Sequence, residues 1–313
     1  NPIVRSMVNG PTPLYLIDSP TPGTGKGLVA EVTGIIATGA SPFVMTEAND
    51  QDEWRKRITS QLLVSPTIVL IDNIRRRLDS SALAAALTTQ SWKDRMLGFS
   101  RMVSIPITCT WIATGNNAAL SNEMARRIVR IRLDAKVERP WERSKFKHPD
   151  LSGWALEHRS EVVGALLLLI RAWVVAGMPK GSEVMGSFQQ WANTMGGILQ
   201  VADIKSFLED REEMYAQADV EMEAWHDFVG LWWVEWGETP VGVAQLIDIA
   251  KERGMLADLR GQRSEHGSRT AMGKRLSNLR DQVLGKYVIR AAGLAYDAKT
   301  LKYQLMIADT GPK

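Results

Sequence analysis

Between residues 13 and 133 the chain repeatedly alternates a short apolar run with a segment of helical pattern. This alternation is typical of βαβ units, in which consecutive strands form a parallel sheet covered by helices. The apolar runs lie at 13–18, 42–47, 67–72, 108–117 and 128–133. We therefore predict an α/β fold with a five-stranded, doubly wound parallel sheet.

The segment SPTPGTGKGLVA, residues 19–30, lies between the first expected strand and the helix after it. It is similar to the phosphate-binding pattern G-x-x-x-x-G-K-[ST]. Gly25 and Lys26 match, whereas Pro20 and Gly27 replace the first glycine and the hydroxyl residue. In such loops backbone N–H groups bind phosphates and the lysine contacts the β and γ phosphates. The predicted nucleotide-binding residues are Pro22, Gly23, Thr24, Gly25, Lys26, Gly27 and Leu28.

The sequence also predicts a position for a divalent metal ion. Four apolar residues, 68–71, are followed by Asp72, which is the pattern of a Walker B strand. We expect Asp72 to hold Mg²⁺ through water. Gly27 lacks the hydroxyl that usually completes this site. Because Mg²⁺ keeps several waters in most proteins, a water or Thr24 would replace it. ATP and Mg²⁺ are therefore the expected cofactors.

Two further motifs complete a nucleotide-hydrolysing set. Asn116 ends the fourth apolar run, at the sensor-1 position, where an amide can orient the attacking water. Arg126 and Arg127 end a short helix that follows. In ring ATPases an arginine at this place reaches the γ-phosphate of the neighbouring subunit. The predicted catalytic residues are Lys26, Asp72, Asn116, Arg126 and Arg127.

The sequence leaves the identity of the catalytic base open. Asn73 follows Asp72 where a glutamate is usual, and an amide can position water but cannot accept its proton. Glu47, at the end of the second strand, and Glu53, in the next helix, are the candidate substitutes. The alternative interpretation is that both are surface carboxylates.

These motifs resemble the AAA+ P-loop ATPase domains of superfamily-three type that follow primase domains in phage and plasmid primase–helicase proteins. The resemblance covers about residues 11–225 and rests on SPTPGTGKG, VLIDN, WKDRMLGFS, ATGNN, MARRIVRIRLD and SFQQWANTMGGILQVADIKSFLED. It implies a hexameric ring that uses ATP to pull single-stranded or forked DNA through a central pore in DNA replication. It also implies an upstream primase domain, encoded on a mobile genetic element, which agrees with a chain that starts at Asn1 without a methionine.

A hairpin is expected between residues 91 and 106, where two short extended stretches flank GFSR. In the family that the chain resembles, a hairpin at this place grips the DNA backbone in the pore. Lys93 and Arg101 are predicted to neutralise phosphates, and Phe99 to stack on a base.

Three other residues have expected roles. Trp92 is expected in the core. Arg95 either contacts DNA or pairs with Asp94 or Glu123. Arg159, in the first helix of an expected lid, is either a second sensor of the nucleotide or a plain salt bridge.

The expected domains are an AAA+ core at 1–140, a helical lid or linker at 141–236 and a winged-helix-like domain at 237–313. The lid ends in the aromatic cluster 225–236, which we interpret as core. The last domain has the order helix, helix, hairpin. Positions 276, 279 and 283 should form the apolar face of its second helix, with basic residues outward. The candidate DNA contacts are Lys274 and Arg275, beside Arg269 and Arg280. This face could bind duplex DNA, contact a partner protein or serve only to keep the protein soluble, and the sequence leaves these alternatives open.

Composition excludes several classes of protein. A single cysteine, Cys109, rules out an internal disulfide and fits the cytoplasm. The four histidines have no metal-ligand spacing. The longest apolar run, 162–170, is too short to cross a bilayer, so no membrane partner is expected.

We weigh three functions against these features. The first is an ATP-dependent replicative DNA helicase or translocase that acts as a ring. The alternative is a nucleotide-gated DNA-binding or assembly module with weak or no hydrolysis, which Gly27 and Asn73 favour. A protein-remodelling machine would need an aromatic–hydrophobic–glycine pore loop after the second strand, where TEANDQDEW stands instead.

Overall fold

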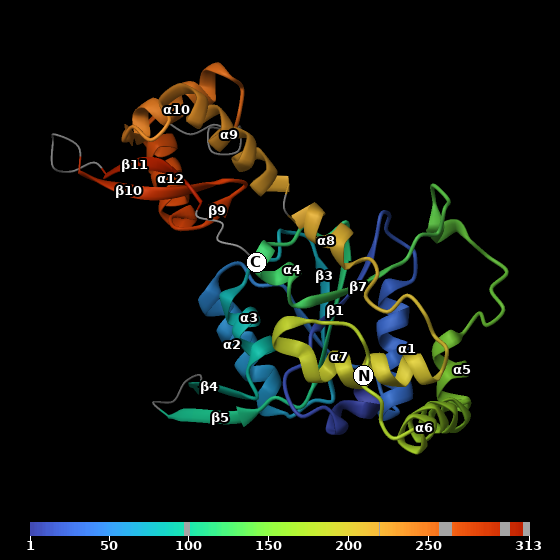
Figure 1. The fold of residues 1–313 in the computed structure, drawn as a ribbon. Helices are drawn as coiled ribbons and strands as arrows, with labels where there is room; N and C mark the ends of the chain where they lie inside the picture. The colour runs from blue at the N-terminus through green and yellow to red at the C-terminus, as the bar shows by residue number, and fades with distance from the viewer. Residues whose placement is uncertain (97–100, 219, 257–264, 295–300, 309–313) are drawn as a thin grey trace. The chain divides into compact units, whose positions relative to one another are not determined.

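A computed structural model of the chain describes residues 1–96, 101–218, 220–256, 265–294 and 301–308 (Figure 1). Internal contacts divide the chain into two compact units, Asn1–Ala218 and Asp219–Lys313. Each unit has its own hydrophobic core. The expected division into three domains stays a prediction.

The first unit is built on a five-stranded parallel sheet with the order β2-β3-β6-β1-β7 (Figure 1). Each strand lies within its predicted run or extends it by at most two residues, so the predicted α/β sheet is confirmed. Because carboxyl ends of parallel strands share one edge, the polar residues that end these strands lie at that edge. The strands are β1 (Leu14–Ser19), β2 (Phe43–Thr46), β3 (Ile68–Ile74), β6 (Thr110–Asn116) and β7 (Ile128–Arg132).

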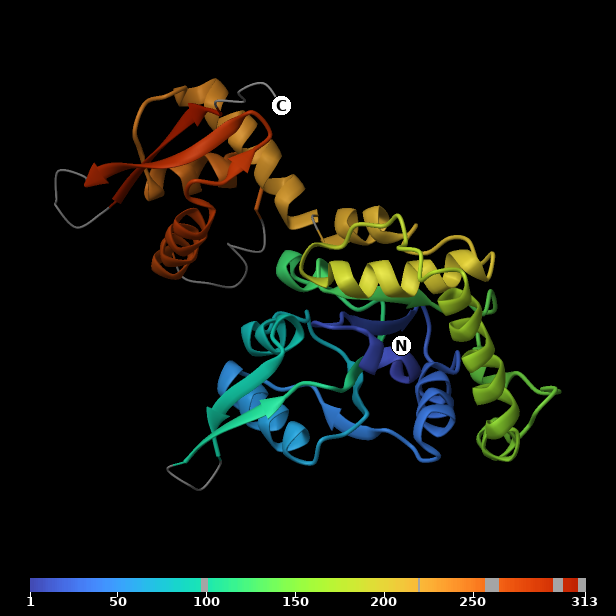
Figure 2. The same cartoon turned by 60° about the horizontal axis from the view of Figure 1, so that its bottom comes forward.

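Helices cover both faces of the sheet (Figure 2). On one face α1 (Lys26–Thr38) packs through a small core formed by Ile17, Ala30 and Ile112 with neighbouring strand residues. The other face carries the larger core, in which the helices listed next take part. They are α2 (Gln51–Leu63), α3 (Ser81–Thr88), α4 (Asn122–Ala125), α7 (Gln189–Val201) and α8 (Arg211–Ala218).

The region after the sheet is helical, as its sequence pattern predicts. It contains α5 (Leu151–Glu157), α6 (Arg159–Val175), the short turn η3 (Gly186–Phe188) and α7. A second short turn, η2 (Pro140–Glu142), precedes α5, and η1 (Pro2–Met7) begins the unit. Within the part of the chain that the structure describes, no helix is long and apolar enough to cross a membrane.

Arg159 lies at the end of α1 that is remote from the phosphate loop. Its Nε donates to the carbonyls of Ile35 and Ile36 at 3.1 and 3.0 Å, and Nη2 donates to the carbonyl of Ala37 at 3.3 Å. These carbonyls belong to the last turn of α1, where the Ile35 carbonyl also accepts the backbone N–H of Gly39 at 2.7 Å, and a cation there is favoured by the helix dipole. The second-sensor interpretation of Arg159 is therefore wrong, because this side chain caps α1.

Replacing Arg159 by alanine is expected to lower the free energy of unfolding by about 1–2 kcal/mol, because three carbonyls lose a charged donor. ATP affinity should not change. Arg159→Lys keeps the charge without the planar group, so its free energy of unfolding should lie between those of the wild type and Arg159→Ala. Urea unfolding and ATP titration of the same samples test this. A variant with normal stability and weakened ATP binding would contradict the capping role.

The predicted hairpin is confirmed in its two strands, β4 (Ser91–Arg95) and β5 (Met102–Pro106), which pair antiparallel. Trp92 is buried and its indole N–H donates to Thr59 Oγ1 at 2.8 Å, so its expected core position is confirmed. Residues 97–100 between the strands, including Phe99, lie outside the described residues.

The expected pairing of Arg95 is wrong, because both of its candidate partners are held by other arginines. Arg55 Nη2 lies 2.5 Å from Asp94 Oδ1. Arg127 Nη2 lies 3.4 Å from Glu123 Oε1. Arg95 itself donates only its backbone N–H to Asp94 Oδ1, at 2.8 Å. Burial raises the pKa of Asp94, but the hydrogen bonds that it accepts bring the pKa below its usual value.

The second unit joins helices to a small sheet of order β8-β11-β10-β9. Trp225, Phe228 and Trp232 are fully buried, which confirms the core interpretation of the aromatic cluster. The predicted order of helix, helix and hairpin is also observed. Its elements are α9 (Val220–Trp236), β8 (Val241–Gly242), α10 (Val243–Glu252), α12 (Glu265–Leu279), β9 (Val283–Leu284), β10 (Tyr287–Leu294) and β11 (Leu301–Ile307).

The predicted apolar face of the second helix is right in part. Leu276 and Leu279 are buried, but Val283 is exposed and belongs to β9, beyond the end of α12. Met272, one turn before Leu276, completes the buried stripe instead. The error arose because the helix ends at Leu279, so the helical period no longer applies to position 283.

Candidate nucleotide site

The loop between β1 and α1 carries the predicted phosphate-binding residues, 22–28. Gly23 and Gly25 have φ angles of +74° and +99°, in the left-handed region that glycine adopts without a steric penalty. Gly25 immediately precedes α1, so the unpaired N–H groups of the first helical turn adjoin the loop. The local geometry is that of an anion-binding loop, and the binding role of each residue stays a prediction.

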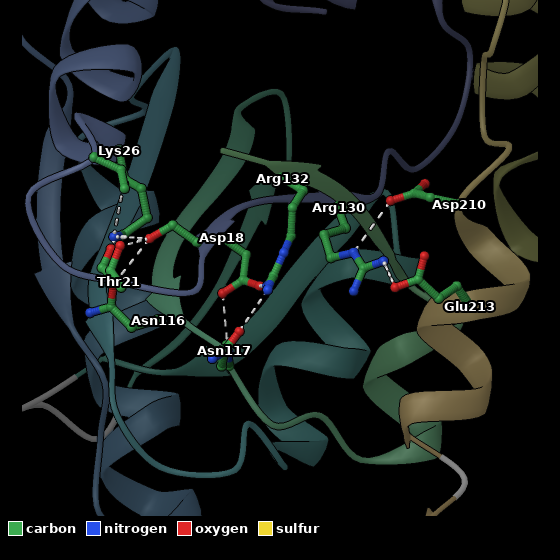
Figure 3. Close-up of polar contacts among 12 residues, drawn as sticks. Asp18, Thr21, Lys26, Asn116, Asn117, Arg130, Arg132, Asp210 and Glu213 are labelled. Carbon is green, nitrogen blue, oxygen red and sulfur yellow. Dashed lines mark hydrogen bonds and ion pairs between the residues drawn. The ribbon is translucent and has the colours of Figure 1, made fainter. Parts of the chain in front are cut away.

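Lys26 reaches from the start of α1 to the ends of two strands (Figure 3). Its Nζ lies 2.6 Å from both Ser19 Oγ and Asn116 Oδ1. Ser19 and Asn116 are opposite each other in the pairing of β1 with β6. Burial lowers the pKa of Lys26, and the carboxylates of Asp18 and Asp72 partly oppose this. The sheet thus brings the predicted lysine and the predicted sensor amide into direct contact.

Asp72 lies at the carboxyl end of β3 with an exposed side chain. Its Oδ1 accepts a hydrogen bond from Thr114 Oγ1 at 2.7 Å. The same hydroxyl accepts the backbone N–H of Asn73 at 2.8 Å. Asn73 has a φ of +60°, and the pairing of β3 with β6 is irregular there. This network fixes the orientation of the Asp72 carboxylate at the same edge of the sheet as Lys26.

The residues present fit a magnesium ion held mainly by water and phosphate. An added Cβ at Gly27 would meet no atom within 4 Å, so there is open space where a hydroxyl residue usually stands. Among the described residues, no group of three or more His, Cys, Asp or Glu side chains could hold a metal alone. A single carboxylate, Asp72, with waters and nucleotide oxygens is a set that Mg²⁺ accepts.

Both candidate glutamate bases have local partners. Glu47 Oε2 accepts the backbone N–H groups of Arg75 and Arg76 at 3.1 and 3.2 Å. Glu53 Oε1 lies 3.0 Å from Arg57 Nε. Glu47 directly follows Thr46, which is opposite Asp72 in the sheet, so the strand register places Glu47 close to Asp72. The roles of Asn73, Glu47 and Glu53 as bases stay predictions.

The two candidate trans-acting arginines directly follow α4. Arg126 is exposed, and its Nε donates to the carbonyl of Asn122 at 3.3 Å. Arg127 is less exposed and donates to the carbonyl of Glu123 at 2.5 Å. Arg126 is therefore the more accessible of the two, a distinction that the sequence does not make.

Sequence reasoning missed a polar network beside this site (Figure 3). The buried Asp18 carboxylate pairs with Arg132 and accepts the backbone N–H of Ala118 at 3.1 Å. Arg132 also donates to Asn117 Oδ1 at 2.8 Å. The network ties the end of β7 to the segment after Asn116. Its only sequence signal is an acidic residue at the end of an apolar run.

Most of the described DNA candidates have exposed side chains. In β4 the side chains alternate, with Trp92 and Asp94 buried and Lys93 and Arg95 exposed. Arg101 is also exposed, and its carbonyl accepts the N–H of Met96 at 2.8 Å. In the second unit Lys274 is exposed and Arg275 is half-buried. Of the flanking arginines, Arg269 pairs with Glu265 and Arg280 with Asp281.

The parallel sheet with flanking helices is an α/β fold consistent with a P-loop NTPase. No protein-family profile and no curated protein matches the sequence. Among solved structures, JCV helicase with a bound acetamide compound is similar at a TM-score of 0.33 and 17% identity, over 68% of this chain and 58% of that one. Another X-ray structure of JCV helicase is similar at a TM-score of 0.32 and 17% identity, over 68% of this chain and 57% of that one. The chain spans less than two thirds of the helicase chains that it matches.

Proposed function

We propose that this chain is an ATP-dependent DNA helicase or translocase that works as a ring, a hexamer by the family resemblance, on single-stranded or forked DNA. The observation that carries the proposal is the contact of Lys26 with Asn116. This contact lies near Asp72 and directly after the glycine-containing loop. A lysine, an amide and a carboxylate at this edge are three of the groups that take part in nucleotide hydrolysis.

Each residue has a distinct role in the proposed reaction. The loop N–H groups and Lys26 bind the phosphates and stabilise the charge that develops in the transition state. Asn116 orients the attacking water through its amide. Asp72 holds Mg²⁺, which, when bound, neutralises charge on the phosphate oxygens. ATP then replaces Asn116 as the principal partner of Lys26.

The remaining parts of the proposal concern assembly and DNA. Arg126 or Arg127 would act on the nucleotide of a neighbouring subunit. The exposed face of β4 and β5 would follow the DNA backbone. The helices from 141 would act as the lid, and the second unit as a winged helix. An upstream primase would complete a primase–helicase of a mobile element.

Steady-state ATP hydrolysis with and without single-stranded DNA tests the proposal, with wild type compared to Asn116→Ala, Arg126→Ala and Arg127→Ala. We expect DNA-stimulated turnover in the wild type and a loss of about 100-fold or more in the first variant and in one arginine variant. If that arginine acts in trans, mixing its variant with Lys26→Ala should restore activity, because one interface then has both intact groups.

Replacing Lys93 or Arg101 by alanine is expected to weaken single-stranded DNA binding and to reduce the salt dependence by about one released ion each. Both residues are exposed cations, so their loss should not affect folding. Fluorescence anisotropy of labelled DNA at several salt concentrations measures this slope. Lys205→Ala, which removes a cation with 84% side-chain exposure elsewhere in the unit, is the control. Equal slopes for all variants would contradict a DNA role for the hairpin.

A specific observation also favours the second function, a nucleotide-gated module with little hydrolysis. Asn73 occupies the usual position of the catalytic base and its backbone is fixed by Thr114. Tight ATP binding without turnover in the wild type would support this alternative and exclude the motor.

A further inference from the structure

The short turn η2 lies directly against the phosphate loop. An added Cβ at Gly23 would lie 2.9 Å from Trp141 Cβ, 3.1 Å from its N and 3.3 Å from its Cα. The chain after β7 therefore passes over the open side of Gly23, at a distance that only a glycine permits. The positive φ of Gly23 adds a second reason for glycine at this position.

The side chain that this contact places at the loop is unusual for its exposure. Trp141 is 57% exposed, whereas the other ten tryptophans, all within the described residues, are buried or half-buried. The flat, partly apolar face of an exposed indole can stack on an aromatic ligand such as a nucleotide base. Here the residue adjoins the loop that carries the predicted phosphate ligands.

The turn that presents Trp141 is held by its neighbours. Pro140 is buried, and its carbonyl accepts Arg143 Nε at 3.2 Å. The N–H of Glu142 donates to the carbonyl of Arg139 at 3.1 Å, and the two side chains form an ion pair at 3.2 Å. The backbone that carries the indole is therefore fixed before any ligand binds, which lowers the ordering cost of a contact.

We propose that Trp141 is the residue that binds the base of the nucleotide, by stacking its indole on the purine ring. The inference rests on the proposed function, because it needs phosphates at 22–28. A nucleotide whose phosphates lie at 22–28 carries its base one ribose beyond the α-phosphate, and Trp141 is the exposed aromatic residue whose Cβ lies beside that loop. Stacking uses the face of the base and not its hydrogen-bonding edge, so the site should accept ATP and GTP similarly.

The test compares two probes, ATP and inorganic tripolyphosphate, which lacks a base. Trp141→Ala is expected to weaken ATP binding by about 5- to 100-fold, the usual range for one stacked base, and to leave tripolyphosphate binding unchanged. Trp141→Phe should retain most of the ATP affinity. Phe43→Ala is the matched control, because Phe43 is a 51% exposed aromatic residue at the opposite, amino end of β2.

Three other results would overturn the proposal. Equal weakening of both probes by Trp141→Ala would mean that Trp141 supports the loop and does not contact the base. Unchanged ATP binding in that variant, with binding lost in Lys26→Ala, would remove the stacking role but keep the nucleotide site. If the wild type binds neither probe, the proposed function fails together with the inference.

Discussion

Replacing Lys26 by alanine is expected to reduce ATP hydrolysis by about 100-fold or more and to weaken ATP binding. In the structure the ammonium group of the half-buried Lys26 lies between a hydroxyl and an amide oxygen, so it is positioned before the nucleotide arrives. No other described cation donates to Asn116 Oδ1. The measurement is steady-state hydrolysis together with ATP titration.

The matched control for this variant is Lys205→Ala, which removes the same side chain from an exposed position of the same unit. It should hydrolyse ATP at the wild-type rate. The loss in Lys26→Ala should appear without a change in the urea midpoint, since the residue is at the start of α1 and not in a core. Normal hydrolysis by Lys26→Ala would contradict a phosphate-binding role for the whole loop.

The sequence predicts the sheet well, and for a physical reason. Strands covered on both faces need continuous apolar runs, and the five runs are separated by turns and helices of ordinary length. Once the strands are parallel, their carboxyl ends meet at one edge. This is why Lys26, Asp72 and Asn116, which are far apart in the chain, could be expected together from their positions alone.

Side-chain partners between distant segments could not be predicted in the same way. Arg159 binds carbonyls of α1 more than 120 positions away, and Asp18 pairs with Arg132 across 114 positions. Such pairs depend on how helices and strands pack and not on local pattern. The error for Arg95 has the same origin, because Arg55 from α2 reaches Asp94 from a segment that the local sequence does not show.

Replacing Trp191 by alanine is expected to lower the free energy of unfolding of the first unit by about 3–5 kcal/mol. This side chain is fully buried in α7, and its indole N–H donates to the Tyr15 hydroxyl of β1 at 2.8 Å. Its ring also contacts Tyr15 edge-to-face at 6.1 Å between centroids and Phe207 at 5.5 Å. The variant therefore loses a large buried volume, and the hydroxyl of the half-buried Tyr15 loses its donor. Urea unfolding followed by circular dichroism measures the loss.

Two further variants separate the contributions. Trp191→Phe keeps much of the volume but not the hydrogen bond, so it should cost less, about 1–3 kcal/mol. Burial raises the pKa of Tyr15 and the indole N–H lowers it, so the same variant should raise that pKa further. Trp141→Ala removes an equal ring from an exposed site and should change stability by no more than about 0.5 kcal/mol. If it destabilised the unit as much as Trp191→Ala does, burial would not be what distinguishes the two tryptophans. The stability of Trp141→Ala also matters for the stacking experiment, because a folded variant is what allows a loss of ATP affinity to be attributed to the missing indole.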